Sequence, residues 1–229
     1  YEFKYLLTRD QQARLLATAG EDLRPDVYSH SSIRNLYLDT PDFRLIRRSL
    51  EKPVYKEKLR LRSYGRTERD SPVFMELKKK YRSIVYKRRL TLPYDRALDC
   101  LTGACPWPET QIGGEIRYTV DFYPDLESRV FLAYERDSWL APESGLRITF
   151  DDAIRFRTEE LTLDSDPWGT ALLGPDQVLM ELKAPGAIPL WMVRLLTEMR
   201  LYKTSFSKYG TAYQLLLERE WKDLLTKVK

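Results

Sequence analysis

Basic residues alternate with apolar residues along several short segments of this sequence. In Lys58-Leu59-Arg60-Leu61-Arg62, every second residue is a lysine or an arginine. In an extended strand, this period of two places the three cations on one face and the two leucines on the other. Four further segments repeat the pattern, with these positions sharing a face: Glu76, Lys78 and Lys80; Lys87 and Arg89; Arg147, Thr149 and Asp151; Glu181 and Lys183.

Two interpretations of these charged faces are open. An antiparallel sheet commonly turns one face to water, and each face taken singly fits such a solvated surface. Taken together, however, the faces carry more lysine and arginine than neutral polar residues. Like charges on neighbouring strands repel unless an anion or a carboxylate compensates them. We therefore predict that the strands close into a barrel whose polar interior holds a triphosphate, because arginine and lysine both bind phosphate oxygens.

Carboxylates that share the alternating positions of the basic residues predict a divalent metal ion in the same interior. They are Glu2, Glu76, Asp151 and Glu181. Their hard oxygen atoms suit Mg²⁺ or Mn²⁺, which would bridge carboxylate and phosphate, while ion pairs with neighbouring cations are the alternative role. Glu181 is the preferred metal ligand, because it follows the apolar run Val178-Leu179-Met180, where an uncompensated carboxylate would be costly.

The composition argues against several other kinds of chemistry. The one histidine, His30, lies in a polar stretch interpreted as an exposed loop, so imidazole catalysis and a histidine-ligated zinc site are not expected. Cys100 and Cys105 are interpreted as free thiols of a cytoplasmic protein, with a disulfide between them as the alternative. The formal net charge of +4 does not favour nucleic acid, and no apolar run approaches the ~20 residues of a membrane helix.

The elements that position the charged faces follow from periodicity and from turn residues. Strands are predicted at residues 1–7, 33–39, 54–63, 73–82, 84–92, 129–139, 146–154 and 177–183, with a hairpin turn at Arg82-Ser83. Helices are predicted at residues 8–19, 41–50, 94–101, 188–199 and 208–225. Residues 109–123 fit either a strand or a helix, and we favour the helix. Residues 1–229 are thus expected to form one α+β domain, a barrel or a sandwich.

Eight short motifs follow one another along nearly the whole chain. They are Glu2-Phe3-Lys4-Tyr5, Tyr37-Leu38-Asp39-Thr40, Lys58-Leu59-Arg60-Leu61-Arg62, Glu76-Leu77-Lys78, Tyr134-Glu135-Arg136, Arg147-Ile148-Thr149-Phe150-Asp151, Glu181-Leu182-Lys183 and Ser207-Lys208-Tyr209. In this order they resemble the VTC domain, the polyphosphate polymerase module of the vacuolar transporter chaperone, in the triphosphate tunnel metalloenzyme or CYTH-like superfamily. The resemblance implies a closed, mostly antiparallel eight-stranded tunnel with helices outside.

The resemblance also implies an activity and residue roles. The domain would transfer the terminal phosphoryl group of ATP to a polyphosphate chain, with Mn²⁺ or Mg²⁺ held by Glu181. Catalysis would consist of positioning and charge stabilisation by Arg60, Arg62, Lys78, Arg136 and Arg147. Phosphates would contact these five residues and eight more, which are Lys4, Lys80, Lys87, Arg89, Tyr134, Lys183, Ser207 and Lys208. Hydrolysis of a triphosphate, and polyphosphate binding without catalysis, are the alternatives.

Overall fold

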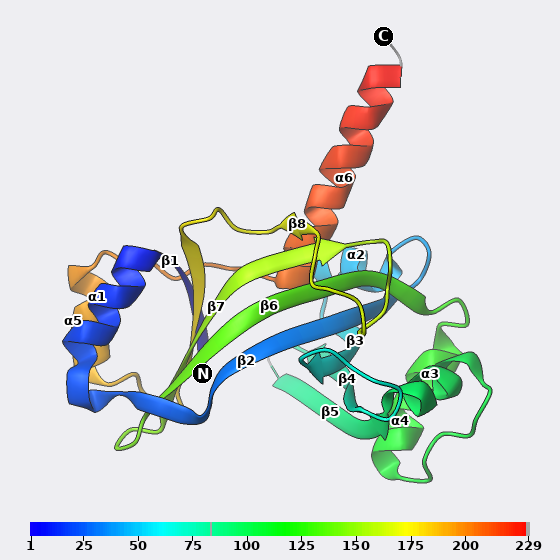
Figure 1. The fold of residues 1–229 in the computed structure, drawn as a ribbon, viewed down its shortest axis with the longest axis horizontal. Helices are drawn as coiled ribbons and strands as arrows, with labels where there is room; N and C mark the ends of the chain where they lie inside the picture. The colour runs from blue at the N-terminus through cyan, green and yellow to red at the C-terminus, as the bar shows by residue number, and fades with distance from the viewer. Residues whose placement is uncertain (83, 228–229) are drawn as a thin grey trace. The chain divides into compact units, whose positions relative to one another are not determined.

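The computed structural model describes residues 1–82 and 84–227, so Ser83 of the predicted hairpin turn lies outside the described residues. Figure 1 shows an α+β arrangement. The elements in chain order are β1 (Glu2–Thr8), α1 (Arg9–Ala19), the 3-10 turn η1 (Gly20–Asp22), β2 (Arg24–Asp39), α2 (Arg44–Leu50), β3 (Tyr55–Tyr64), β4 (Pro72–Tyr81), β5 (Ile84–Pro93), α3 (Tyr94–Thr102), α4 (Gln111–Phe122), β6 (Glu127–Ala141), β7 (Leu146–Arg157), β8 (Thr170–Ala171), β9 (Gln177–Lys183), α5 (Leu190–Glu198) and α6 (Lys208–Lys227).

The strands form one mostly antiparallel sheet. Its order is β1-β9-β7-β6-β2-β3-β4-β5, and β8 pairs with β7 beside this path. Eight strands form this path, which agrees with the expected number. The two-residue β8 is a ninth strand of the described residues, and it was not predicted because it is too short to show a periodic pattern. Among the described strands, the two end strands β1 and β5 are not hydrogen-bonded to each other. The closed barrel therefore stays a prediction.

The chain divides into two compact units. Unit 1 comprises Tyr1–Ser32, Tyr134–Ile154 and Ala171–Ser207, and unit 2 comprises Ile33–Ala133, Arg155–Thr170 and Lys208–Lys229. The long strands β2, β6 and β7 each contribute residues to both units. Each unit has a hydrophobic core of its own, and each carries its own charged sheet face.

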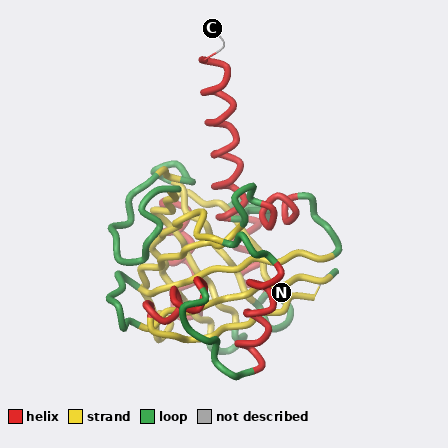
Figure 2. Tube along the Cα trace, turned by 90° about the vertical axis from the view of Figure 1, so that its right-hand side faces the viewer, coloured by secondary structure: helices red, strands yellow, loops and turns green. Residues whose placement is uncertain are grey.

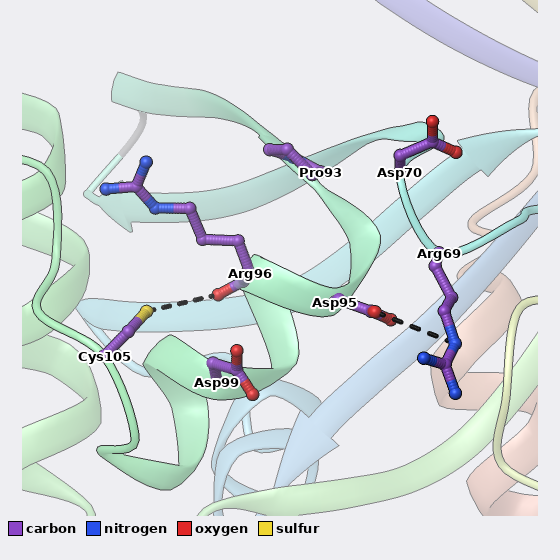
Figure 3. A pocket seen from close by; sticks show the side chains of 7 residues that line it. All are labelled: Arg69, Asp70, Pro93, Asp95, Arg96, Asp99 and Cys105. Carbon is purple, nitrogen blue, oxygen red and sulfur yellow. Dashed lines mark hydrogen bonds and ion pairs between the residues drawn. The ribbon is translucent and has the colours of Figure 1, made fainter.

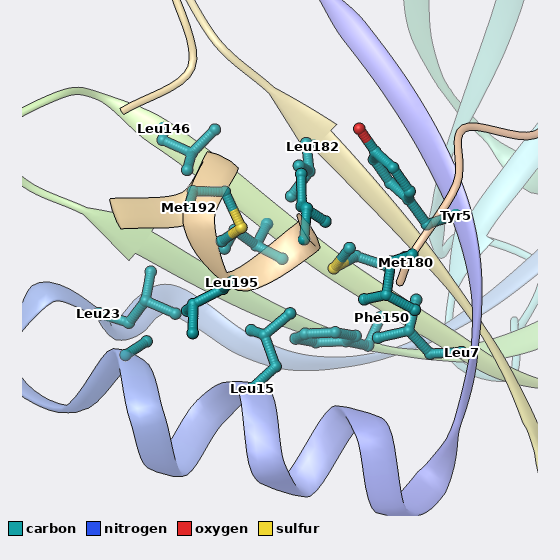
Figure 4. Packing of buried hydrophobic residues seen from close by; sticks show 14 of the residues in the cluster. Tyr5, Leu7, Leu15, Leu23, Leu146, Phe150, Met180, Leu182, Met192 and Leu195 are labelled. Carbon is teal, nitrogen blue, oxygen red and sulfur yellow. The ribbon is translucent and has the colours of Figure 1, made fainter. Parts of the chain in front are cut away.

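The core of unit 1 lies between its strands and the helices α1 and α5. Figure 4 shows Leu15 of α1 and Met192 of α5 packed against Tyr5, Phe150 and Met180 from β1, β7 and β9. The apolar residues occupy every second position of these strands. The charged residues between them therefore point to the opposite face, as the alternation predicted.

The core of unit 2 lies beneath α3 and α4, which contact β4 and β5. Leu59, Leu61, Met75 and Leu77 are fully buried in it, each at 0% exposure. These residues alternate along β3 and β4 with the predicted phosphate-binding residues, so the helices cover only the apolar face. The C-terminal part of α6 extends away from the strands of unit 2 (Figures 1 and 2). Among the described helices, none has both the length and the hydropathy that a membrane crossing requires.

Two predicted element starts need correction, and one open alternative is settled. β2 begins at Arg24 instead of Ile33, so His30 lies in a strand and not in a loop. Its exposed imidazole contacts Asp137 of β6, 2.8 Å from Nδ1. Helix α2 begins at Arg44, because Asp39 accepts hydrogen bonds from the first backbone N–H groups of that helix. The helical alternative for residues 109–123 is confirmed as α4.

Candidate functional site

Glu76 of β4 is the centre of a cation cluster in unit 2. Its side chain is 2% exposed, and its Oε2 accepts hydrogen bonds from Nη2 and Nε of Arg60 at 2.6 and 2.9 Å. Its Oε1 accepts hydrogen bonds from Nη2 and Nε of Arg89 at 2.5 and 2.8 Å, and lies 2.8 Å from Nζ of Lys87. Nε of Arg62 lies 3.8 Å from Oε2. The fold thus gathers four of the predicted phosphate-binding residues around one carboxylate.

The strand register produces this cluster. Arg60 of β3 and Arg89 of β5 lie directly opposite Glu76 on its two sides. Burial by itself would raise the pKa of Glu76, but Arg60, Arg62 and Lys87 together hold it well below its usual range. The carboxylate is therefore ionised at neutral pH, and it offsets only part of the positive charge around it.

Positive charge exceeds negative charge on this face of unit 2. Lys58, Lys78 and Lys87 lie directly opposite one another across β3, β4 and β5, and the pair Lys56 and Lys80 follows along the strands. Like charges in such cross-strand pairs destabilise a sheet. Within the described part of these three strands, the face carries one carboxylate, Glu76, and eight cations, which are Lys56, Lys58, Arg60, Arg62, Lys78, Lys80, Lys87 and Arg89.

Tyr37 of β2 is joined to the cluster through Arg60. Its hydroxyl oxygen accepts a hydrogen bond from Nη1 of Arg60 at 2.9 Å, and its ring stacks on Tyr209 with 4.3 Å between the centroids. Burial by itself would raise the pKa of Tyr37, but the nearby Arg60, Lys58 and Arg62 lower it to about 8. The phenol thus lies in a field that favours negative charge.

We expect Tyr37→Phe to remove a pH-dependent part of the stability. The pKa of Tyr37 falls from 10.0 to about 8 on folding, so its ionisation stabilises the folded state fully above pH 10.0, and this contribution is lost as the pH falls through about 8. The difference in unfolding free energy between the wild type and the variant should therefore grow by about 3 kcal/mol across this window. Urea unfolding at a series of pH values measures it, and phenolate absorbance checks the midpoint. A constant difference would show that Tyr37 does not ionise there.

Glu181 of β9 is the central carboxylate of unit 1. Its side chain is 7% exposed, and its Oε1 lies 3.2 Å from Nζ of Lys4. Its Oε2 lies 3.6 Å from Nη2 of Arg136 and 3.9 Å from Nζ of Lys183. Arg136 also binds the fully buried Asp151 through two hydrogen bonds, with Nε 2.5 Å from Oδ1 and Nη2 2.6 Å from Oδ2. One guanidinium therefore bridges two buried carboxylates.

Burial acts on the cations of this cluster in different ways. Burial by itself would lower the pKa of Arg136, but Asp151 and Tyr134 raise it further above its usual range. Burial lowers the pKa of Lys183, and Glu181 offsets this effect only in part. Unit 1 thus combines an arginine that is always charged with a lysine that loses its proton more readily than a lysine in water.

The donor set of unit 1 fits a divalent cation that is shared with a phosphate. Within the described residues, no group of three histidine, cysteine, aspartate or glutamate side chains is placed to hold a metal ion. Mg²⁺ commonly uses only one or two carboxylates and completes its shell with water and substrate phosphates. Glu181 and Asp151 supply such carboxylates, and the buried hydroxyl of Thr149, directly opposite Glu181, has no hydrogen-bond partner. Glu181 and Asp151 are therefore the residues that would hold the ion.

Three other predicted site residues belong to unit 1 and one belongs to unit 2. Nη2 of Arg147 lies 2.6 Å from Oδ2 of Asp26, and the Arg147 side chain is 57% exposed. Tyr134 is buried, and its ring centroid is 5.3 Å from Cζ of Arg136. Ser207 ends unit 1 and Lys208 begins α6 in unit 2, and both are half-buried.

Several residues that contact the site were not predicted. Asn35 accepts a hydrogen bond from Nε of Arg62 at 3.0 Å, and the ring centroid of Phe74 is 4.7 Å from Cζ of Arg89. Tyr37 likewise belongs to unit 2, where it contacts Arg60. The alternation of β2 and β4 places these side chains on the charged face, and only their neutrality hid them. Assigning every second residue of a strand to the charged face, whether or not it is charged, would have identified Asn35, Tyr37 and Phe74.

A surface pocket of unit 2 lies beside α3 and offers different chemistry (Figure 3). It has a volume of about 460 Å³, and its lining comprises Arg69, Asp70, Pro93, Asp95, Arg96, Asp99 and Cys105. With three aspartates and two arginines, it has no excess of positive charge for a phosphate. Sγ of Cys105 lies 3.1 Å from Sγ of Cys100, and both residues are free thiols, as predicted.

The fold and the clusters define an α+β protein whose sheet carries cations and buried carboxylates on one face. This face is opposite to α1 and α5 in unit 1 and to α3 and α4 in unit 2. The model of the VTC domain matches residues 1–217, and the chain therefore belongs to the VTC domain family. This match confirms the resemblance seen in the eight motifs. No curated protein matches the chain.

Several solved structures are similar to this chain in fold. An adenylate cyclase-like protein from Bacillus halodurans matches with a TM-score of 0.56 and 16% identity, over 90% of this chain and 92% of that one. Another from Vibrio parahaemolyticus matches with a TM-score of 0.51 and 12% identity, over 93% and 97%. A protein from Hippeastrum, described as having a dominant triphosphatase activity, matches with a TM-score of 0.49 and 15% identity, over 91% and 92%. At these identities the first two comparisons establish the fold.

Proposed function

We propose that this protein is a metal-dependent polyphosphate polymerase, which transfers the terminal phosphoryl group of ATP to a polyphosphate chain. Membership of the VTC domain family supports this reaction type, because that domain is the polymerase module of the vacuolar transporter chaperone. The substrates are ATP, or another triphosphate, and inorganic polyphosphate. The closed eight-stranded tunnel of the resemblance remains part of this proposal.

The row of Lys58, Lys78 and Lys87 is the observation that carries the proposal. These three cations face one another across three neighbouring strands. A solvated surface has no reason to align like charges, which repel each other in this geometry. A chain of phosphates compensates several cations at once, whereas a single carboxylate such as Glu76 compensates only its nearest neighbours.

The proposed chemistry demands little covalent participation by the protein. Phosphoryl transfer depends on holding the attacking and leaving oxygens in line and on stabilising negative charge. Arg60 and Arg62 would position phosphates in unit 2, and Arg136 would do so in unit 1. A divalent ion bound by Glu181 would neutralise phosphate oxygens and orient the transferred group. The exposed His30 and the free thiols are not required for this reaction.

Incubation of the purified protein with ATP and Mn²⁺ or Mg²⁺ tests the proposal. We expect long polyphosphate, detected by staining after electrophoresis, with little free phosphate. Free phosphate alone would identify a hydrolase. Tight polyphosphate binding with neither product would identify a binding protein without catalysis. Because the site is held together by charge, added salt should weaken tripolyphosphate binding.

Neighbouring lysines of β4 provide a matched pair of variants for this assay. Lys78 lies on the charged face opposite Lys58 and Lys87, whereas Lys79 alternates to the other face opposite Glu57. Lys78→Ala should lower polymer yield and tripolyphosphate affinity about tenfold, and Lys79→Ala should change neither. Equal effects of the two substitutions would show that tripolyphosphate binding responds to the net charge of the protein and not to a specific site on this face.

A further inference from the structure

Thr149 of β7 carries a buried hydroxyl group that nothing in the protein satisfies. The residue is 5% exposed, and its Oγ1 makes no hydrogen bond. Buried polar groups are nearly always paired, because leaving a hydroxyl without water or a partner costs free energy. Such an exception in a folded protein is a sign of a bound water, ion or ligand.

The position of this hydroxyl links it to the carboxylate cluster of unit 1. Thr149 lies directly opposite Glu181 in the antiparallel pairing of β7 with β9. Directly opposite residues carry their side chains on the same face, about 5 Å apart at Cβ. Asp151, two positions further along β7, shares that face and binds Arg136. Any group that binds beside Glu181 therefore lies within reach of the Thr149 hydroxyl.

The chemistry of the surrounding groups indicates what this hydroxyl binds. Lys4, Arg136 and Lys183 surround Glu181 at 3.2 to 3.9 Å, so the neighbourhood favours an anion that can share these cations. A hydroxyl donates one hydrogen bond, and phosphate oxygens are strong acceptors that carry negative charge. A water molecule could also satisfy Thr149, and it would leave ligand affinity independent of this residue.

We propose that the Thr149 hydroxyl donates a hydrogen bond to a phosphate oxygen of the triphosphate or polyphosphate substrate, beside Glu181. This inference rests on the proposed function, and it adds a further neutral phosphate-recognition residue beside the charged groups around Glu181. A bound phosphate would give the buried hydroxyl its hydrogen-bond partner. Thr149 is a binding residue in this scheme, and it exchanges no proton.

The test is a calorimetric titration of the protein with inorganic tripolyphosphate in the presence of Mg²⁺. Thr149→Val keeps the branched shape and removes the hydroxyl, so we expect its affinity to fall roughly ten- to hundredfold. Thr149→Ser keeps the hydroxyl and should retain most of the affinity. Thermal unfolding without ligand should show no loss of stability in Thr149→Val, because an unpaired buried hydroxyl contributes nothing to the folded state.

Thr67 offers a matched control. Its hydroxyl is also buried without a partner, but it lies in unit 2 on the segment between β3 and β4. Thr67→Val should leave the tripolyphosphate affinity unchanged. Equal affinities of the wild type and Thr149→Val would overturn the inference and assign the hydroxyl to solvent. If the wild type itself fails to bind tripolyphosphate, the proposed function fails, and the inference fails with it for that separate reason.

Discussion

Replacing Glu181 with glutamine is expected to abolish metal-dependent turnover, with a loss of at least about a hundredfold. The substitution keeps the size of the side chain but removes the charge that lies among Lys4, Arg136 and Lys183. A neutral amide binds Mg²⁺ or Mn²⁺ poorly, because these hard ions prefer charged oxygen ligands. It also leaves three neighbouring cations with less compensation, so we expect a folded but less stable variant, by about 2 kcal/mol.

A control separates the loss of the metal ligand from the loss of stability. Glu135 of β6 belongs to the opposite face of unit 1, where its Oε1 accepts a hydrogen bond from Ser32 at 2.6 Å. Glu135→Gln should keep both turnover and metal dependence. Activity is measured well below the unfolding temperature of each variant, over a range of Mn²⁺ concentrations. Full activity of Glu181→Gln at ordinary metal concentrations would remove Glu181 from the site.

The charged faces could be predicted because side-chain direction in a strand depends only on local geometry. Lys58, Arg60 and Arg62 share a face in any extended chain, and their alternation with buried leucines indicated which face is polar. The hairpin of β4 and β5 then brings Arg89 opposite Glu76. This is why the sequence placed the cations of unit 2 on one face, whereas their binding of phosphate stays a prediction.

The partners within each cluster could not be predicted, because they depend on pairings between distant segments. Nothing near Arg136 in sequence indicates that it binds Asp151, and nothing near Glu181 indicates Lys4. Residues 24–32 were missed as a strand because they are largely exposed and lack apolar alternation. A neutral residue such as Tyr37 carried no charge signal, so only the structure showed its contact with Arg60. The sequence placed Thr149 on a charged face, but only the strand register placed it opposite Glu181.

Glu76→Gln should strongly destabilise unit 2, with a loss of about 3 kcal/mol of unfolding free energy at neutral pH. The carboxylate is almost completely buried and accepts hydrogen bonds from Arg60 and Arg89. Its removal leaves these arginines and Lys87 facing one another without a buried anion. Because Arg60, Arg89 and Lys87 are partly exposed, water limits the cost, and the loss lies at the lower end for buried pairs.

The pH dependence of this loss has a definite sign. Folding lowers the pKa of Glu76 below its usual range, so its stabilisation is present above about pH 4.5 and is lost as the pH falls towards the folded-state pKa. The difference in unfolding free energy between the wild type and Glu76→Gln should therefore become smaller at acidic pH. Urea unfolding at neutral and acidic pH measures it. Glu115→Gln, which breaks the more exposed pair with Arg88, should cost less than about 1 kcal/mol.

Tripolyphosphate should partly restore the stability of Glu76→Gln. A ligand that binds only the folded state raises the unfolding free energy, and the rise is larger when affinity is higher. Removing the carboxylate of Glu76 raises the net positive charge of this face by one, so the variant should bind the anion more tightly and gain more than the wild type. An equal gain in both proteins would mean that tripolyphosphate binds away from Glu76, and the phosphate site of unit 2 would have to be sought on another surface.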